Sequence, residues 1–339
     1  AAALSVLISM AAAVTLLPAL LGIVGHKIDK FSLPGRRSKT HEIESGRWAK
    51  WATAIQNKPW PVTIVSMLTL LIISVPATSI RLGTADAGTN AKGTTTRSAY
   101  DLIAKGFGAG FSGPLTVVAS IPTGADLSPL SSLSDSMKAD SDVAEVMPAI
   151  VSADQKVVTL IVYPKSSPQS AETSDLINRL RAKTIPTAIG DSSIKVYVGG
   201  STATSKDFAS ALSSKLPVFM GAVILLSFML LMFVFRSLFI PLKAAAMNML
   251  SIGAAFGVIV AIFQWGWGSS ITSIEPGPIE PMVPMMLFAI LFGLSMDYEV
   301  FLVSRIQEEY LISGDNSAAV RRGMAATGGV ITAAATIMF

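Results

Sequence analysis

Residues 282–305 read MVPMMLFAILFGLSMDYEVFLVSR, which places Asp297 and Tyr298 inside a largely apolar run. About 20 apolar residues suffice for a helix to cross the hydrocarbon core of a bilayer. A carboxylate near the middle of such a helix costs roughly 2.5–3.5 kcal/mol on insertion scales, and such groups usually move protons or ions or pair with another polar group. The segment therefore predicts a membrane helix with a proton or ion relay at Asp297 and Tyr298.

Helical spacing shows which residues would surround this carboxylate. At about 100° per residue, Asp297 shares a face with Gly293, Leu294 and Phe301. Gly293 leaves room for another helix to approach Asp297, and the phenol of Tyr298 can reach a carboxylate on a neighbouring helix. A carboxyl balanced between burial and an opposing polar group can load and release a proton near neutral pH. The alternative is an Asp–Tyr pair that only locks two helices together.

The composition excludes several classes of protein. Hydrophobic residues make up 51% of the 339 residues and charged residues only 14%, whereas soluble domains carry about 25% charged residues. The chain has no cysteine, and its two histidines, His26 and His41, lie in a basic loop. We therefore predict an integral membrane protein without a metal, a cofactor or a nucleic-acid partner. No nucleophile or cofactor-binding loop in the sequence indicates an enzyme.

Hydropathy divides the chain into spans and connections. Four segments are long enough to cross a bilayer, residues 61–80, 216–235, 240–265 and 282–305. Residues 1–24 supply most of another span and residues 323–339 the start of a last one. Because the chain begins and ends inside apolar segments, we expect it to be a piece of a longer polypeptide.

The distribution of Lys and Arg predicts the orientation of these spans. Basic residues gather in three connections, residues 25–60, 236–243 and 306–322, whereas residues 266–281 contain no Lys or Arg. Positively charged short loops stay in the cytoplasm. Residues 81–215 and 266–281 are therefore expected on the outer side of the membrane.

Residues 81–215 form a predicted domain of their own. Strand-like runs occupy residues 115–121, 143–150, 157–163 and 194–199, and helix-like runs occupy about 127–139 and 169–185. This β-α-β-β-α-β order is that of a ferredoxin-like split βαβ unit. The fold class is thus a multi-span α-helical membrane protein with an inserted α+β porter domain. In the span that follows the turn at 236–243, Gly253 and Gly257 form a small-xxx-small pattern that indicates close helix packing.

Several segments resemble one known family. FGLSMDYEVFLVSRIQEEY at 292–310, FVFRSLFIPLKAA at 233–245 and LGTADAG at 82–88 resemble the MmpL family (mycobacterial membrane protein Large) of the resistance-nodulation-division superfamily. The resemblance implies twelve spans in two similar halves, each with an outer porter domain. Residues 1–24 would then be the last span of the first half, and residues 61–339 would belong to the second half.

The resemblance also implies a function. It predicts an exporter in the bacterial inner membrane, driven by the proton gradient, whose cargo is lipid or glycolipid of the cell envelope. Asp297 and Tyr298 match the Asp-Tyr pair that the second half contributes to the proton relay. Leu294 and Phe301 match apolar residues of the central cavity, and Gly293 is expected to line this cavity with them. The partner pair would come from first-half helices that this chain lacks. Membrane lipids are expected around the spans.

Two other functions stay open at this stage. The same superfamily includes exporters of drugs or siderophores, and the lining of the outer-domain cavity would distinguish these from a lipid exporter. A sterol-sensing-like membrane scaffold without transport activity is the other alternative. A partner helix with no ionisable or phenolic residue opposite Asp297 would favour that scaffold.

Overall fold

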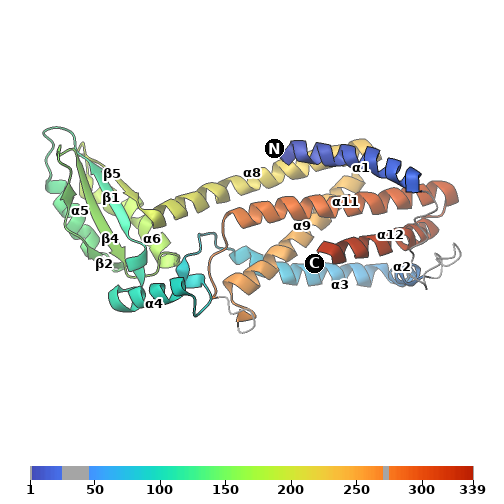
Figure 1. The fold of residues 1–339 in the computed structure, drawn as a ribbon, viewed down its shortest axis with the longest axis horizontal. Coiled ribbons are helices and arrows are strands. Elements are labelled where there is room, and N and C mark those ends of the chain that lie inside the picture. Colours follow the sequence, from blue (N-terminus) through green and yellow to red (C-terminus); the bar gives the residue numbers. More distant parts are fainter. Residues whose placement is uncertain (1, 25–45, 270–274, 339) are drawn as a thin grey trace. The chain divides into compact units, whose positions relative to one another are not determined.

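The computed structural model describes residues 2–24, 46–269 and 275–338. The two histidines, most of the basic 25–60 connection and part of the 266–281 loop lie outside these residues. The described chain divides into two compact units, residues 1–58 with 301–339, and residues 59–300. Each unit is described by itself, and its elements carry the labels of Figure 1.

The first unit consists of helices from both ends of the chain. It contains α1 (Ala2–Val24), α2 (Arg47–Asn57), the last part of α11 (Met282–Ser313) and α12 (Asn316–Met338). Helix α2 packs on α12, where the ring of Trp48 lies against Gly328. The side chain of Gln56 also donates to the carbonyl oxygen of Ser317 at 3.1 Å. The expected connection at 306–322 is therefore mostly helical, with a short break between α11 and α12.

Long helices form the apolar part of the second unit. They are α3 (Pro59–Ser74), which continues into a 3-10 turn (Val75–Ser79), α8 (Ser201–Phe235), α9 (Phe239–Ile259), which continues into a π turn (Val260–Gln264), and the first part of α11. Helix α9 packs on α3. The close contact is at Gly257, where a Cβ atom would overlap the carbonyl oxygen of Ile73.

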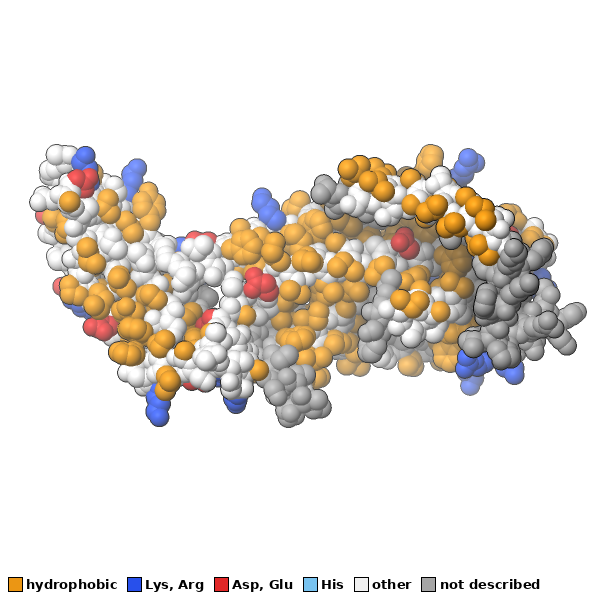
Figure 2. Space-filling view, in the orientation of Figure 1, with side chains coloured by type: hydrophobic (Ala, Val, Ile, Leu, Met, Phe, Trp, Pro, Cys, Tyr) orange, Lys and Arg blue, Asp and Glu red, His pale blue; other side chains and the backbone are white. Residues whose placement is uncertain are grey.

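Five helices of the described chain are long and apolar enough to cross a membrane. These segments are Leu7–Val24, Pro59–Ser79, Ser201–Phe235, Phe239–Gln264 and Met282–Ser313. Large apolar side chains stay exposed along them, for example Phe233 and Phe239, each 84% exposed, and Figure 2 shows hydrophobic side chains over much of the visible helical surface. Such faces are stable in lipid and not in water. The chain is therefore a multi-span helical membrane protein.

A five-stranded antiparallel sheet is inserted between α3 and α8. It contains β1 (Leu115–Ser120), β2 (Val143–Val146), β3 (Ile150–Val151), β4 (Val157–Pro164) and β5 (Lys195–Gly199). The order is β2-β4-β1-β5, and β3 also pairs with β4. The fold thus combines membrane helices with a porter-like sheet domain.

Helices cover one face of this sheet. They are α5 (Ser128–Lys138), α6 (Ala171–Arg179), a π turn (Leu180–Thr184) and α7 (Ile185–Ile189), whereas α4 (Thr95–Phe107) precedes β1. Alternate residues of β1 and β4, such as Val117 and Val162, point into a core with Leu133 and Leu176. This alternation is the ordinary consequence of the pleat of a strand.

Two predicted elements differ in detail from the structure. The run at 143–150 is two strands, because Pro148 between β2 and β3 has no N–H to donate to a ladder. The run at 169–185 is α6 followed by a π turn and α7, and the N–H of Ile185 donates to the carbonyl oxygen of Leu180. Pro186 follows directly and cannot supply the usual helical hydrogen bond.

Candidate functional site

Helix α11 has one face packed inside the second unit. Pro284, Phe288, Phe292 and Met296 recur every four residues and are buried. The rings of Phe288 and Phe292 stack with centroids 5.4 Å apart, and Phe219 of α8 meets Phe288 edge-on at 6.0 Å. This contact fixes the rotation of α11 about its axis, and so decides where Asp297 lies.

A polar contact joins the same helix to α9. The hydroxyl of Ser295 donates to Oδ1 of Asn248, which is buried. The Nδ2 group of Asn248 is buried and has no hydrogen-bond partner among the described residues. The contact is therefore a single interhelical bond with one donor left over.

Asp297 lies on the exposed side of α11. Gly293, Asp297 and Phe301 are all exposed and follow each other at helical spacing, whereas Leu294 and Tyr298 are half-buried. Apart from its chain neighbours and the nearby backbone of α11, no described residue lies within 4 Å of a Cβ atom placed on Gly293. The relay residues Asp297 and Tyr298 and the cavity residues Gly293, Leu294 and Phe301 thus lie on or beside a face that the described chain leaves open. Their roles stay predictions.

The packing glycines lie on α9 beside α3. Besides the contact of Gly257 with Ile73, a Cβ atom on Gly253 would lie 3.2 Å from the hydroxyl oxygen of Ser74. No group of three or more His, Cys, Asp or Glu residues in the described ranges is arranged to hold a metal ion.

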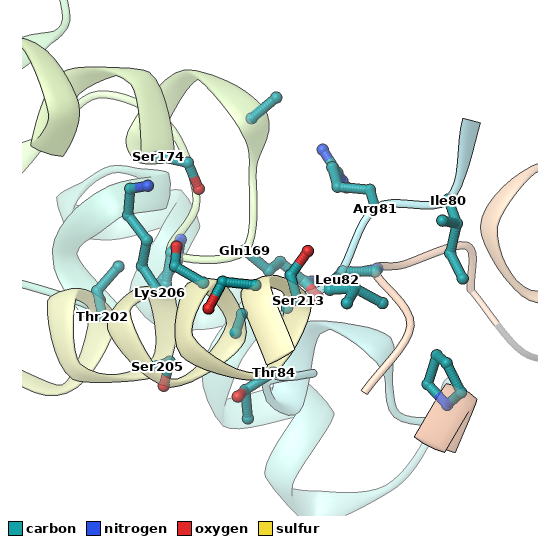
Figure 3. Close-up of a pocket in the computed structure, with 18 of the residues that line it drawn as sticks. Ile80, Arg81, Leu82, Thr84, Gln169, Ser174, Thr202, Ser205, Lys206 and Ser213 are labelled. Carbon is teal, nitrogen blue, oxygen red and sulfur yellow. The ribbon is translucent and has the colours of Figure 1, made fainter. Parts of the chain in front are cut away.

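A second candidate site is a cavity of about 700 Å³ where the sheet domain adjoins the membrane helices. Its walls are one face of α8, the segment Ile80–Thr84 and the loop and helix start at 168–175. Figure 3 shows Thr202, Ser205, Lys206 and Ser213 along α8, with Gln169 and Leu82 near Ser213 in the view. At the membrane side, the lining includes Leu216, Phe256 and Pro284. The cavity thus has an apolar end and a polar end.

A smaller cavity of about 300 Å³ adjoins the polar end. The two cavities share the lining residues Thr84, Pro168, Thr202 and Ser205, and the smaller one also reaches Asp86 and Tyr100. Both cavities belong entirely to the second unit. They are therefore neighbouring parts of one candidate site.

Asp86 and Tyr100 have incompletely satisfied polar groups. Oδ1 of Asp86 accepts from the N–H of Gly88 at 2.8 Å, but Oδ2 of Asp86 and the hydroxyl of Tyr100 are buried without a hydrogen-bond partner in the described chain. Burial and the nearby charge of Asp86 raise the pKa of Tyr100 to about 12. The Tyr100 hydroxyl therefore stays protonated at neutral pH.

The sequence gives little indication of this second site. Asp86 follows a Gly- and Thr-containing segment, Tyr100 lies in α4, and Gln169 is in the loop before α6. No motif or periodicity links residues so far apart in the chain. Only the capping function of Asp86, an Asp shortly before a turn, is a recognisable local signal.

The chain is similar to known membrane transport proteins. The model of a family described as "MMPL family" matches residues 1–62 and 92–339. Membrane protein YdfJ of Bacillus subtilis is 37% identical over 99% of this chain and 46% of its own length. The mycolic acid-containing lipids exporter MmpL11 of Mycolicibacterium smegmatis is 30% identical over 99% of this chain and 36% of its own. The trehalose monomycolate exporter MmpL3 of Mycobacterium tuberculosis is 28% identical, over 98% and 39%. The chain therefore spans less than half the length of these curated relatives.

Proposed function

Because the chain belongs to the MMPL family, we propose that it is part of an exporter that uses the proton gradient to move lipid or glycolipid out of the inner membrane. Two relatives are named as exporters of mycolic acid-containing lipids and of trehalose monomycolate. Transport and not catalysis is the activity proposed. Because the chain covers less than half of these relatives, the activity belongs to the full-length protein.

The observation that carries this proposal is the open face of α11 around Asp297. A carboxylate on a membrane span is costly unless it pairs or exchanges protons, and Asp297 is exposed within the described chain. We infer that helices from the rest of the polypeptide cover this face and supply its polar partners. Gly293 would let such a helix approach closely, because its Cβ position is open.

The proton gradient would act on the side chains of Asp297 and Tyr298. Protonation of Asp297 would remove one charge from the helix interface. The neighbouring Tyr298 side chain would keep the groups of the proton pathway in position. One charge that crosses 100 mV provides about 2.3 kcal/mol, and a pH gradient adds to this. Leu294 and Phe301 would line the cavity that opens and closes as the helices move.

We propose that the sheet domain, residues 81–215, is a ferredoxin-like porter domain on the outer side of the membrane. Support comes from its strand order, β2-β4-β1-β5 with antiparallel neighbours, and from the helices that connect β1 to β2 and β4 to β5. The basic connections at 25–60, 236–243 and 306–322 would then face the cytoplasm.

The substitution Asp297→Asn in the full-length protein tests the function. Proteoliposomes with a trapped pH indicator would report proton flux, and complementation of a deletion strain would report export. We expect both activities to be lost at normal protein abundance, because an amide cannot exchange the proton. Glu308→Gln is the matched control, since Glu308 lies on the same helix and pairs with Arg305 at 2.6 Å. Full activity of Asp297→Asn would reduce Asp297 to a helix lock.

A further inference from the structure

We propose that helix α2 binds the phosphate groups of anionic phospholipids through a basic stripe, which consists of Arg47, Lys50 and Lys58. The partner is the head-group layer of the leaflet in which α3 begins. This interaction goes beyond the proposed export and does not depend on it.

Helix α2 lies next to a membrane span in the sequence. It ends at Asn57, Lys58 is its C-cap residue, and α3 begins at Pro59. The span Pro59–Ser79 is long and apolar enough to cross a bilayer, and Trp60 near its start is 76% exposed. Trp is enriched where membrane helices pass through the head-group layer. Because a single residue separates α2 from the span, the C-terminal end of α2 lies at the level of the head groups.

The other face of α2 is fixed by packing on α12 (Figure 1). Ala49 and Ala52 are only 2% and 1% exposed. The ring of Trp48 lies so close to α12 that a Cβ atom added to Gly328 would be 2.7 Å from it. Gln56 donates to a carbonyl oxygen at the start of α12 at 3.1 Å. These contacts set the rotation of α2 about its axis, and so they decide which side chains point away from the protein.

The outward face of α2 combines basic side chains with an aromatic ring. Arg47, Lys50, Trp51 and Ala54 recur at intervals of three and four residues and are exposed, so they share one side of the helix. Trp51 is 57% exposed. A Trp ring among Lys and Arg is typical of helices that lie in the interface between lipid and water. The composition of this face therefore matches the head-group layer.

The charges of the basic stripe are not neutralised within the protein. None of Arg47, Lys50 and Lys58 forms an ion pair with another residue that the structure describes. The sequence has no Asp or Glu from residue 45 to residue 85. Each Lys or Arg near an anionic membrane surface favours binding by about fivefold. An anionic head group is thus the partner that complements this face.

A simple topology signal is the competing explanation of these charges. Basic residues beside a span keep it oriented whatever lipid surrounds them. The same connection contains five further Lys or Arg between residues 27 and 39, which would preserve the orientation if the stripe were neutralised. A topology signal does not require that Arg47 and Lys50 share one side of a helix with an exposed Trp51. The two explanations differ in whether anionic lipid gathers at α2.

Energy transfer from a dye on α2 to labelled lipids measures which lipids lie beside the stripe. The chain has no cysteine, and Ala54 is exposed on the same side of the helix. Ala54→Cys in the full-length protein, freed of any cysteine elsewhere, would carry the donor dye in vesicles of phosphatidylcholine and phosphatidylglycerol. The acceptor would be a trace of chain-labelled phosphatidylglycerol or, at equal density, chain-labelled phosphatidylcholine. The ratio of the two transfer signals gives the local enrichment of the anionic lipid.

We expect phosphatidylglycerol to be enriched at least about fivefold, the effect of one basic group at an anionic surface. Replacing Arg47, Lys50 and Lys58 together by Gln should bring the two transfer signals close to equality. Lys50→Arg with Lys58→Arg keeps the charges and should keep the enrichment. Equal signals from the unaltered stripe would overturn the proposal. An enrichment that survives the triple replacement would overturn it too, because other basic residues would then attract the lipid.

The matched control removes the same charge from the sheet domain. Its three lysines are exposed and form no ion pair with another described residue, and they are Lys105, Lys156 and Lys183. Their joint replacement by Gln should leave the enrichment at α2 unchanged. An equal loss in this control would mean that the net charge of the protein, and not the stripe, attracts the lipid.

Salt tests the unaltered stripe and so does not depend on the folding of a variant. The Debye length falls from about 10 Å at 0.1 M to about 3 Å at 1 M ionic strength, so the enrichment should fall steeply over this range. Enrichment that salt does not reduce would contradict an interaction between charges at the surface. In vesicles of phosphatidylcholine alone, the triple variant should unfold at the same temperature as its parent, because the stripe has no ion-pair partner in the described chain.

Discussion

The side chain of Gln264 donates through Nε2 to the carbonyl oxygen of Ser79 at 2.7 Å. Its Oε1 atom accepts from the N–H of Arg81 at 2.8 Å. Gln264 ends the helical segment of α9, and residues 79–81 lead from α3 into the sheet domain. On the other side of this lead-in, Leu82 forms a β-bridge with Ile279, just before α11. The lead-in is therefore held by the segments on both sides.

From the two hydrogen bonds of the Gln264 side chain we predict an order of stability among Gln264 variants. Gln264→Leu removes both hydrogen bonds, which lie at exposed positions and contribute about 0.5–1.5 kcal/mol each. Gln264→Glu keeps an acceptor for Arg81 and loses the donor for Ser79. Thermal unfolding of the full-length protein should give wild type, then Glu, then Leu, in falling stability. Equal stability of all three proteins would show that these two hydrogen bonds do not stabilise the fold.

The glycines of the membrane helices should differ sharply in their tolerance of alanine. At Gly257 the added methyl group overlaps the Ile73 carbonyl, and overpacking of this kind costs about 1–3 kcal/mol. At Gly253 the neighbour is the Ser74 hydroxyl at 3.2 Å, which can shift. We therefore expect Gly257→Ala to lower the yield of folded protein and Gly253→Ala to have a small effect.

Gly293→Ala provides a test of the uncovered face of α11. No described residue opposes its Cβ position, and alanine favours a helix by about 1 kcal/mol over glycine. The thermal stability of the 339-residue chain should therefore not fall. Transport by the full-length protein should fall if another helix approaches Asp297 there. Unchanged transport would count against a close partner at this position.

How far the sequence predicts this structure depends on the range of the signal. Long apolar runs and the 3.6-residue period predict both α11 and the common face of Gly293, Asp297 and Phe301. The alternation of β1 and β4 likewise predicts strands with one buried side. These patterns are local in the sequence, and the elements that they predict are present in the structure.

The lining of the two cavities cannot be predicted from local patterns. Their walls combine residues 80–86, Tyr100, Gln169 and the first turns of α8, which meet only through tertiary packing. The unpaired state of Asp86 Oδ2 depends on where every neighbouring donor lies. No pattern along one sequence encodes that arrangement, so the second site was not predicted.

The bond between Ser295 and Asn248 leads to a less intuitive prediction. Ser295→Ala removes the partner of Oδ1 of the buried Asn248, whose Nδ2 group already has none among the described residues, and the newly unpaired oxygen costs about 1–3 kcal/mol. Asn248→Leu removes the unpaired amide, and the Ser295 hydroxyl can turn to a carbonyl of its own helix. We expect Ser295→Ala to be the more destabilising change. A double-mutant cycle should give a coupling of about 0.6 kcal/mol, and at most about 1.7.

An ion-pair network in the sheet domain predicts a dependence of stability on pH. Nε and Nη2 of Arg179 donate to the two carboxylate oxygens of Asp140 at 2.8 and 2.7 Å, and Nη2 also reaches Asp142 at 2.6 Å. These hydrogen bonds hold the pKa of Asp140 below its usual value. Because the pKa is lowered by folding, the stabilisation is complete above the ordinary carboxyl pKa of about 4. It is lost as the pH falls through the lower folded value.

Asp140→Asn should therefore lower the stability of the sheet domain at pH 7 by about 1–2 kcal/mol, a range reduced for the partial exposure of Arg179. The difference from wild type should shrink as the pH falls below the ordinary carboxyl pKa of about 4, because the stabilisation is lost toward the lower folded pKa of Asp140. Thermal unfolding followed by circular dichroism at several pH values measures both effects. Asp135→Asn, whose carboxylate is 77% exposed and pairs only with Lys138 at 3.6 Å, is the matched control and should be neutral throughout. A deficit of Asp140→Asn that stays the same from pH 7 to pH 3 would mean that packing, and not charge, stabilises this corner of the domain.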